Sequence, residues 1–394
     1  MVLRDYWIER VEQLWGLRSI VWLTGVRRVG KTCLATSLAD VEYFDCDELS
    51  VRRSLRDPMR FLAALRGKRV VLDELHRLDD PSAVLKNAAD HYRDVRIVAT
   101  GSSRISASRK FRDSLTGRKF ELHLRPLVMP DLAPFGTADM THRLAAGGLP
   151  EHFLVPQPDG AFREWMDSFW AKDIQELFPV EQYGPFRRFV ELLLTDSGGM
   201  FEASRFATAS ELSRPSISKY LAILEATHVA TVVRPFTSRR AAEIVSAPRV
   251  YGFDTGFVAH YRGWRELRSE DMGALWEHFV LNELLARLDV DRLHYWRDKR
   301  GHEVDFVVAR PGRDPVAIEC RWSQARADEL GGVAAFRRAY PDGDNYVVAS
   351  DATRPLPVSG AGTQATVVSL GELVTKLAQE QNRVPCPSAL YRQL

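Results

Sequence analysis

A glycine-rich loop between a buried strand and a helix constrains the fold of this chain more than any other feature. Residues 25–32 are Gly-Val-Arg-Arg-Val-Gly-Lys-Thr and fit the pattern G-x-x-x-x-G-K-[ST]. The apolar residues 20–23 before the loop predict a strand, and residues 33–38 after it predict a helix. Such a loop turns successive backbone N–H groups inward at a helix N-terminus, so it predicts a phosphate-binding loop.

The side chains of this loop have separate expected roles. Lys31 is expected to reach the β- and γ-phosphates of a nucleoside triphosphate, and Thr32 to offer its hydroxyl to Mg²⁺. Gly25 and Gly30 permit the backbone path that the loop requires. The residues expected to surround the phosphates are Gly25, Val26, Arg27, Arg28, Val29, Gly30, Lys31, Thr32 and Cys33.

Two further apolar segments, residues 70–72 and 97–99, are each followed by polar side chains. After the first, we expect Asp73 to hold Mg²⁺ together with Thr32, and Glu74 to polarise the attacking water. After the second, Thr100 and Ser102 are candidate sensors of the γ-phosphate, although a plain turn also explains them.

An arginine further along the chain is a candidate for direct contact with a γ-phosphate. Arg118 follows Leu-Thr-Gly at 115–117 and is expected to act as an arginine finger. The phosphate would be bound either by its own chain or by a neighbouring one. A surface salt bridge is the alternative role for this residue.

The order of these segments resembles a known family, the prokaryotic AAA+ ATPases with an uncharacterised C-terminal domain built from a winged helix and a restriction-endonuclease-like fold. The resemblance covers nearly the whole chain. It rests on the glycine-rich loop, on residues 72–74, 100–103, 115–118 and 126–127, and on Gly-Gly-Leu-Pro-Glu at 147–151, which is similar to the family's linker. It implies binding of ATP with Mg²⁺ and ATP hydrolysis. His76 departs from the family pattern, in which glutamine is expected.

The length of 394 residues and four changes of periodicity predict several domains with an overall α/β fold. Alternating strands and helices over residues 1–130 predict the ATPase domain with a parallel sheet. We expect a helical linker or lid over 131–194, a winged helix-turn-helix over 195–260, a restriction-endonuclease-like α/β domain over 261–380 and a tail over 381–394.

The middle of the chain contains a helix-turn-helix pattern. Apolar spacing predicts helices over residues 204–212 and 216–226, and the family resemblance identifies residues 231–250 as a wing. If the second helix enters a DNA major groove, it and the wing bring several basic residues to the DNA. These residues are Arg214, Lys219, Arg234, Arg239 and Arg240. Because the helix itself carries few basic side chains, packing within the chain or between subunits is the alternative.

Three carboxylates in the C-terminal part form a second candidate site. Glu277 lies on a predicted helix, and Asp305 and Glu319 lie on predicted strands. This arrangement resembles the D…E-x-K pattern of restriction-endonuclease-like folds, in which carboxylates hold Mg²⁺. Arg321 stands where lysine is expected, and arginine has no readily lost proton for activating water. A structural or nucleic-acid-cradling domain is therefore favoured over an active nuclease.

Composition narrows the class of protein without identifying a partner. Hydrophobic residues make up 45% and charged residues 27%, which excludes disordered and fibrous chains. The net charge is +2, with an excess of +7 over residues 1–130 and −5 over the remainder. Four scattered cysteines, a charged N-terminus and the lack of a long apolar run predict a cytoplasmic protein without a membrane segment.

Three functional hypotheses follow from these patterns. The first is a Mg²⁺-dependent ATPase whose nucleotide state changes how the C-terminal region engages a partner, either DNA or a protein. The second is an ATP-regulated nuclease, and the third is a nucleotide-gated scaffold with slow turnover. Slow turnover would follow if an arginine finger must come from another copy of the chain or from a partner.

Overall fold

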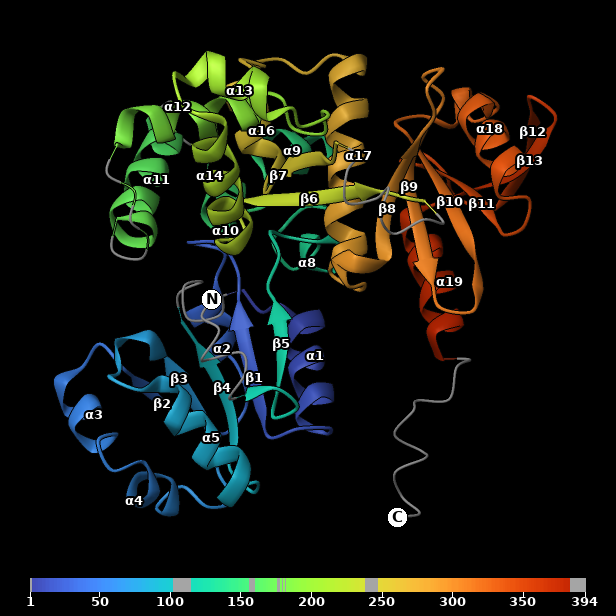
Figure 1. The fold of residues 1–394 in the computed structure, drawn as a ribbon. Coiled ribbons are helices and arrows are strands. Elements are labelled where there is room, and N and C mark those ends of the chain that lie inside the picture. Colours follow the sequence, from blue (N-terminus) through green and yellow to red (C-terminus); the bar gives the residue numbers. More distant parts are fainter. Residues whose placement is uncertain are drawn as a thin grey trace. The chain divides into compact units, whose positions relative to one another are not determined.

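The computed structural model describes residues 2–101, 115–155, 160–175, 178, 180, 182–237 and 247–382, which form two compact units (Figure 1). The first unit comprises Met1–Thr195, Ala203–Thr231 and Gly252–Arg262. The second comprises Asp196–Glu202, Val232–Tyr251 and Gly263–Leu394. The segment expected to be a separate winged-helix domain, residues 195–260, therefore contributes to both units.

The first unit contains a five-stranded parallel sheet in the order β2-β3-β4-β1-β5. Its strands are β1 (Ile20–Thr24), β2 (Val41–Asp45), β3 (Arg69–Asp73), β4 (Arg96–Thr100) and β5 (Lys119–His123). The strands predicted from apolar runs are confirmed with ends one residue longer. Because all five strands run in one direction, Thr24, Asp73 and Thr100 lie at the same edge of the sheet.

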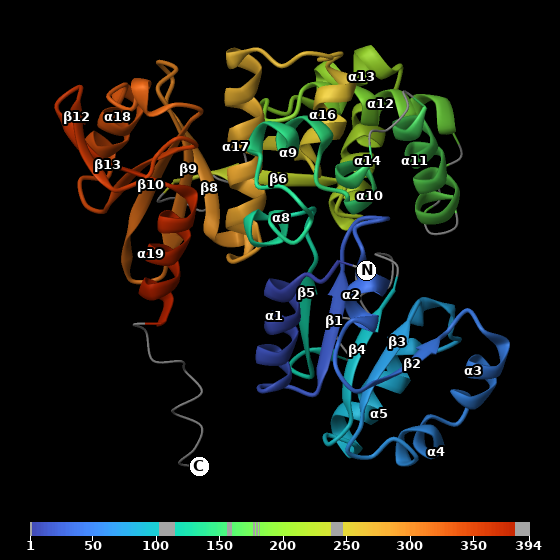
Figure 2. The same cartoon turned by 180° about the vertical axis from the view of Figure 1, so that it is seen from behind.

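Helices surround this sheet, as the near-continuous apolar character of its strands requires. They are α1 (Asp5–Trp15), α2 (Lys31–Thr36), α3 (Leu49–Ser54), α4 (Pro58–Ala63), the 3₁₀ turn η1 (Leu75–Arg77) and α5 (Pro81–His91). Val84, Leu85 and Ala88 of α5 pack against a buried strand face that includes Trp22 and Leu72. In both views α1 lies beside β5 (Figures 1 and 2).

The remainder of the first unit is helical, as the sequence predicts for residues 131–194. Its helices are α8 (Met129–Leu132), α9 (Met140–Ala146), α10 (Pro150–Leu154), α11 (Ala161–Phe169), the π-helix η2 (Trp170–Ile174), α12 (Tyr183–Thr195), α13 (Ala203–Ser210), α14 (Arg214–Ala226) and α16 (Thr255–Tyr261). Asp254 joins distant parts of this unit, because its carboxylate accepts hydrogen bonds from the backbone N–H groups of Gly148 (2.6 Å) and Gly256 (2.9 Å).

The second unit is built on a mixed sheet in the order β12-β13-β11-β10-β9-β8-β6-β7. Its strands are β6 (Ala230–Pro235), β7 (Arg249–Gly252), β8 (Leu293–Arg297), β9 (Glu303–Arg310), β10 (Arg313–Arg321), β11 (Asn345–Ala349), β12 (Leu356–Gly360) and β13 (Thr363–Val368). Residues 273–350, within the expected α/β domain, hold four of these strands, β8 to β11. The expected wing strands, β6 and β7, extend this sheet, and β6 pairs in parallel with β8.

Helices cover the sheet of the second unit. They are α17 (Ser269–Leu285), α18 (Gly331–Ala339) and α19 (Leu370–Asn382), with the 3₁₀ turns η3 (Val290–Arg292) and η4 (Gln324–Arg326). Val333 and Phe336 of α18 pack in a hydrophobic cluster with Val307 and Val347. Trp276 of α17 donates a hydrogen bond to the carbonyl oxygen of Val348 (3.0 Å), and α19 lies in front of the strands in Figure 2. Among the described residues, no helix combines the length and apolar composition needed to cross a bilayer.

Candidate functional site

The glycine-rich loop has the predicted strand–loop–helix setting. β1 ends at Thr24 and α2 begins at Lys31. Gly25 and Gly30 have φ angles of 146° and 98°, which side chains rarely permit. A Cβ atom on Gly25 would also lie 2.6 Å from the carbonyl oxygen of Leu124. The loop therefore requires glycine at this position for both conformational and steric reasons.

Lys31 is held inside the loop. Its Nζ donates hydrogen bonds to the carbonyl oxygens of Gly25 (2.9 Å) and Val26 (3.2 Å). Burial lowers the pKa of Lys31, and the negative charges of Glu74 and Asp173 oppose this effect. A buried ammonium group surrounded by backbone dipoles is suited to receive the charge of a phosphate group.

Asp73 is the centre of a hydrogen-bond network at the carboxyl edge of the sheet. One carboxylate oxygen accepts hydrogen bonds from the hydroxyls of Thr32 (2.8 Å) and Tyr43 (2.8 Å), and the other accepts one from the hydroxyl of Thr100. The structure thus brings together Thr32, Asp73 and Thr100, which are far apart in the sequence. The adjacent hydroxyl and carboxylate oxygens of Thr32 and Asp73 form a donor set that suits Mg²⁺.

Tyr43 is a member of this network that sequence reasoning missed. It lies on β2, where it is opposite Val71 in the parallel register with β3. Its hydroxyl therefore reaches Asp73 across the strand pair, and burial together with this carboxylate raises the pKa of Tyr43. No local motif marks the residue, since its position depends on β2 being the neighbour of β3.

Glu74 has the backbone and the neighbours of a functional residue. Its φ of 51° is left-handed, a strained conformation for glutamate, and its backbone N–H donates to the hydroxyl of Thr100 (3.0 Å). One oxygen of its carboxylate lies 3.1 Å from Nδ1 of His76. The hydrogen bond from His76 lowers the pKa of Glu74, so the side chain is kept ionised.

A cavity of about 720 Å³ lies beside these residues in the first unit. Gly25, Gly30, Lys31, Thr32 and Glu74 line one part of it, and its size suits a nucleotide. The apolar side chains that line another part are Val2, Phe135, Pro150 and Leu154.

The other predicted loop residues divide into two groups. Arg27, Arg28 and Cys33 also line the cavity. Val26 and Val29 are buried in the core, so only their backbone belongs to the loop surface.

The two loop arginines are attached to the helical part of the first unit. Arg27 donates to Ser168 (2.9 Å) and pairs with Asp173 (3.3 Å). Arg28 pairs with Glu164 (2.7 Å). Asp173 belongs to the π-helix η2, and π-helical turns are frequent at functional sites. These contacts give the phosphate loop a direct connection to α11 and η2, which no sequence motif indicated.

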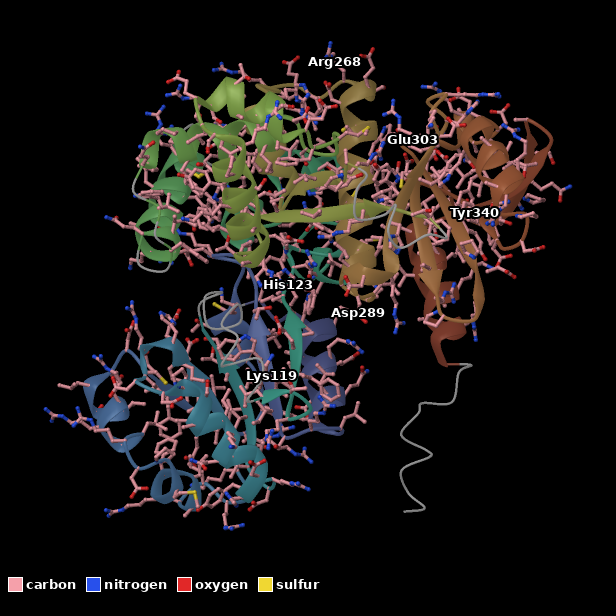
Figure 3. All side chains as sticks on the ribbon, viewed as in Figure 1. Lys119, His123, Arg268, Asp289, Glu303 and Tyr340 are labelled. Atoms are coloured by element: carbon pink, nitrogen blue, oxygen red, sulfur yellow. The ribbon has the colours of Figure 1, made fainter. Side chains whose placement is uncertain are left out.

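Two further sequence candidates are the sensor Ser102 and the arginine finger Arg118. Ser102 lies outside the described residues. Arg118 precedes Lys119, which starts β5 opposite Ile20 at the amino end of β1 (Figure 3), and it pairs with Asp90 (2.7 Å). The four further residues of β1 span ~13 Å between this end and the glycine-rich loop. This position does not fit contact with a γ-phosphate bound by the same chain, so only contact with a neighbour's phosphate stays a prediction.

The three C-terminal carboxylates lie in the second unit and are surrounded by arginines. In the antiparallel register of β9 and β10, Asp305 is opposite Glu319. Arg321 contacts both carboxylates, with distances of 3.0 Å to Glu319 and 3.7 Å to Asp305. On α17, Glu277 accepts hydrogen bonds from the hydroxyl of Tyr251 (2.6 Å) and from Arg249 (3.2 Å).

Arg249 also pairs with Glu303 at the start of β9 (Figure 3). Burial, followed by the negative charge of Asp305, raises the pKa of Glu277 to about 7. The same two causes raise the pKa of Glu319.

This carboxylate cluster does not fit a metal centre. In the part of the chain that the structure describes, no group of three or more His, Cys, Asp or Glu side chains is arranged to hold a metal ion. The expected second metal site at Glu277, Asp305 and Glu319 is therefore corrected. The physical reason is that the guanidinium groups of Arg249 and Arg321 already contact the oxygens of these carboxylates that a metal ion would need.

The expected helix-turn-helix helices are present as α13 and α14. Ser213 caps α14 by accepting a hydrogen bond from the backbone N–H of Ser216 (3.2 Å). Arg214 and Lys219 are exposed on α14, and Arg234 is exposed on β6. Arg239 and Arg240 lie outside the described residues.

Comparison with known proteins defines the class of the first unit. Residues 17–132 match the family described as AAA domain. The chain therefore carries an AAA-type P-loop NTPase domain, and such domains bind nucleotides. Residues 137–268 and 272–373 match two families described as domains of unknown function, DUF8612 and DUF4143.

Individual relatives are similar over most of the chain. Two mycobacterial proteins named "Uncharacterized protein Mb2031c" (Mycobacterium bovis) and "Uncharacterized protein Rv2008c" (Mycobacterium tuberculosis) are each 28% identical over 313 residues, which is 77% of this chain and 70% of theirs. Among solved structures, the Walker-type ATPase PABY2304 of Pyrococcus abyssi has a TM-score of 0.45 at 14% identity, covering 66% of this chain and 96% of its own. A RuvB variant of Thermotoga maritima has a TM-score of 0.31 at 14% identity, covering 61% and 94%.

Proposed function

We propose that this protein is a cytoplasmic Mg²⁺-dependent ATPase whose nucleotide state changes the conformation of its C-terminal region. The observation that carries the proposal is the meeting of Lys31, Thr32, Asp73 and Glu74 beside one nucleotide-sized cavity. This arrangement joins a phosphate-binding ammonium group, an oxygen donor pair and an ionised carboxylate. Cys33, Cys46 and Cys320 are free thiols, which is in keeping with a reducing compartment.

In the proposed reaction each residue has one task. Lys31 exchanges its hydrogen bonds with the loop carbonyls for contacts to the β- and γ-phosphates. Thr32 and Asp73 would hold Mg²⁺, which supplies neutralisation of phosphate charge when bound. Glu74 accepts a hydrogen bond from the attacking water and so orients it towards the γ-phosphate. Thr100 positions Asp73 and Glu74, because its hydroxyl donates a hydrogen bond to the carboxylate of Asp73 and accepts one from the backbone N–H of Glu74.

The coupling to conformation rests on the arginines of the loop. A triphosphate placed beside Arg27 and Arg28 would compete with Asp173 and Glu164 for their guanidinium groups. Binding and loss of the γ-phosphate would therefore change how α11 and η2 are held. The chain continues from these helices into α12, α13 and α14, which links the nucleotide site to the proposed winged-helix region.

The experiment that tests this proposal is steady-state ATP hydrolysis by the Glu74→Gln variant. We expect turnover to fall by about 10² to 10⁴ fold, because general base catalysis contributes this much, while ATP binding is retained. The matched control is Asp79→Asn, an exposed carboxylate close by in the sequence, and its turnover should be unchanged. Full turnover in Glu74→Gln would contradict the role of Glu74.

The nucleotide-gated scaffold is a second candidate that one observation favours. Arg118 lies at the opposite end of the sheet from the glycine-rich loop, so Arg118 could act as an arginine finger only on a phosphate bound by another copy. We propose that isolated protein then turns over slowly and holds ATP. ATP that stays intact for hours in a tight complex would support the scaffold, and rapid hydrolysis by monomeric protein would contradict it.

DNA remains a proposed partner, with the winged-helix and restriction-endonuclease-like regions as the proposed elements. Arg214 and Lys219 are exposed on α14, as contact with DNA phosphates requires. An ATP-regulated nuclease is disfavoured by the arginine pairs at Glu277 and Glu319. Incubation of duplex DNA with several divalent metals tests it, and cleavage that is lost in Asp305→Ala would restore the nuclease hypothesis.

A further inference from the structure

A second cavity lies entirely within the second unit, at the point where β8 begins and β9 ends. Its volume is about 510 Å³, which is within the range of small-ligand sites. The described residues that line it are Val232, Arg234, Phe236, Asp291, Arg292, Leu293, His294, Ala309, Arg310 and Pro311.

The strand register explains why basic side chains gather there. Arg234 on β6 is opposite His294 on β8. In the antiparallel pair of β8 and β9, Leu293 is opposite Val308, so the preceding Arg292 lies beside the end of β9, where Arg310 is found. Three arginines and a histidine therefore reach one cavity from the strands β6, β8 and β9 and from the turn η3 that precedes β8.

The described lining of this cavity has a net positive charge. Asp291 is the one acidic side chain among the described lining residues, against three arginines. Arg292 has a further contact with Asp289 at 3.8 Å (Figure 3), and both side chains are substantially exposed, so this pair is weak.

The chemistry of the lining selects the ligand class. Guanidinium groups bind phosphate oxygens in bidentate geometry, and several of them converge where a phosphate must be held. The apolar side chains of Phe236, Ala309 and Pro311, which are not fully buried, offer a surface for a sugar or a base next to the phosphate. A simple inorganic anion would leave that apolar surface unused.

We propose that this cavity binds the phosphate of a nucleotide, either free or within a single-stranded nucleic acid. Arg234 and Arg292 contact the phosphate, Arg310 adds to the positive field, and His294 offers a ring nitrogen for a hydrogen bond. If the ligand is part of a nucleic-acid strand, this proposal rests on the proposed contact with DNA and adds a binding site to it. It does not rest on ATP hydrolysis, because none of these residues belongs to the first unit.

The test measures binding of a fluorescein-labelled twelve-nucleotide oligothymidylate to the full chain by anisotropy, in a Lys31→Ala background that removes nucleotide binding at the first cavity. The double variant Arg234→Gln/Arg292→Gln should bind roughly tenfold more weakly at low salt. The slope of log K against log[salt] should become shallower by about 1.4, since two phosphate contacts are lost. The matched control, Arg354→Gln, replaces an exposed arginine away from the cavity and should leave both quantities unchanged.

A competition arm distinguishes the two sources of phosphate. Displacement of the oligonucleotide by thymidine triphosphate would identify a free nucleotide as the ligand, and lack of displacement would identify a strand. Unchanged affinity and slope in the double variant would overturn the proposed cavity site. If binding is then lost in Arg214→Gln/Lys219→Gln, the proposed DNA contact stands without the cavity. Absence of binding to either probe would overturn both proposals, and thermal melting confirms that each variant is folded.

Discussion

The two units of this protein surround their carboxylates in different ways, and the difference determines what those carboxylates can do. In the first unit, hydroxyl groups of Thr32, Tyr43 and Thr100 hydrogen-bond to Asp73. In the second, the guanidinium groups of Arg249 and Arg321 neutralise Glu277 and Glu319. Neutral hydrogen-bond donors leave the negative charge of Asp73 available to a cation. A permanently charged guanidinium group instead compensates negative charge at Glu277 and Glu319.

This comparison predicts its largest effect at Arg249. Replacing Arg249 with methionine would leave the largely buried Glu277 without its arginine partner, while Glu303 would keep its pair with Arg297. Breaking a buried ion pair on one side typically costs about 3 to 5 kcal/mol, so the second unit should be destabilised by this amount. Hydrogen exchange measured by mass spectrometry should show faster exchange in α17, β7 and β9, while the first unit keeps its protection.

A matched variant separates burial from charge in this result. Arg326→Met removes an exposed arginine that pairs with Glu329 on the surface of the same unit. It should leave exchange rates unchanged, because exposed pairs contribute little. Equal exchange in Arg249→Met and in the parent protein would show that the cluster does not hold the second unit together.

The second prediction concerns pH. Burial raises the pKa of Glu277 from 4.5 to about 7, so the folded state binds a proton that the unfolded state releases. The stability that this proton provides is complete below pH 4.5 and is lost as pH rises to about 7. The slope within this window is at most ~1.4 kcal/mol per pH unit for one group. Calorimetric melting of the second unit should therefore weaken from pH 5 to pH 7.

The variant Glu277→Gln tests the assignment to this side chain. Glutamine keeps the shape and cannot ionise, so its second unit should lose most of the pH dependence in this window. Arg249 favours ionised Glu277 while burial opposes it, and the guanidinium of Arg249 stays charged and paired with Glu303 when Glu277 is protonated. A melting profile of Glu277→Gln that still weakens from pH 5 to pH 7 would assign the effect to Glu319 instead.

The sequence predicted the first unit better than the second for a physical reason. The glycine-rich loop, Asp73 and Thr100 are each fixed by a local strand ending, and parallel strands bring such ends together whatever their order. Tyr43 depends on which strand neighbours β3, and Asp173 depends on how η2 packs on the loop. Neither the order of the strands nor the packing of η2 can be predicted from a local sequence pattern, so Tyr43 and Asp173 were not identified from the sequence.

The carboxylates of the second unit show the opposite limit of sequence reasoning. Strand alternation correctly placed Asp305 near Glu319. Arg249, however, reaches the cluster from β7, which lies more than 50 residues before Asp305 and Glu319 in the sequence. The charge balance of a buried site depends on every side chain around it. A motif of three carboxylates therefore predicts that the three side chains lie close together, but it does not determine their charge or their chemistry.

The smallest expected effect is at His76, where this chain carries an imidazole beside the carboxylate of Glu74. The hydrogen bond from His76 lowers the pKa of Glu74, so His76→Gln should raise that pKa. The acid limb of the pH profile of kcat should then move to higher pH, with turnover reduced several-fold near pH 5 and almost unchanged at pH 8. The KM for ATP should stay constant if His76, which also lines the cavity, acts only through Glu74. A uniform loss of kcat at all pH values would instead indicate that His76 supports only the folding of η1. An unshifted acid limb in the variant would show that Lys31 and the surrounding charges, rather than His76, keep Glu74 ionised.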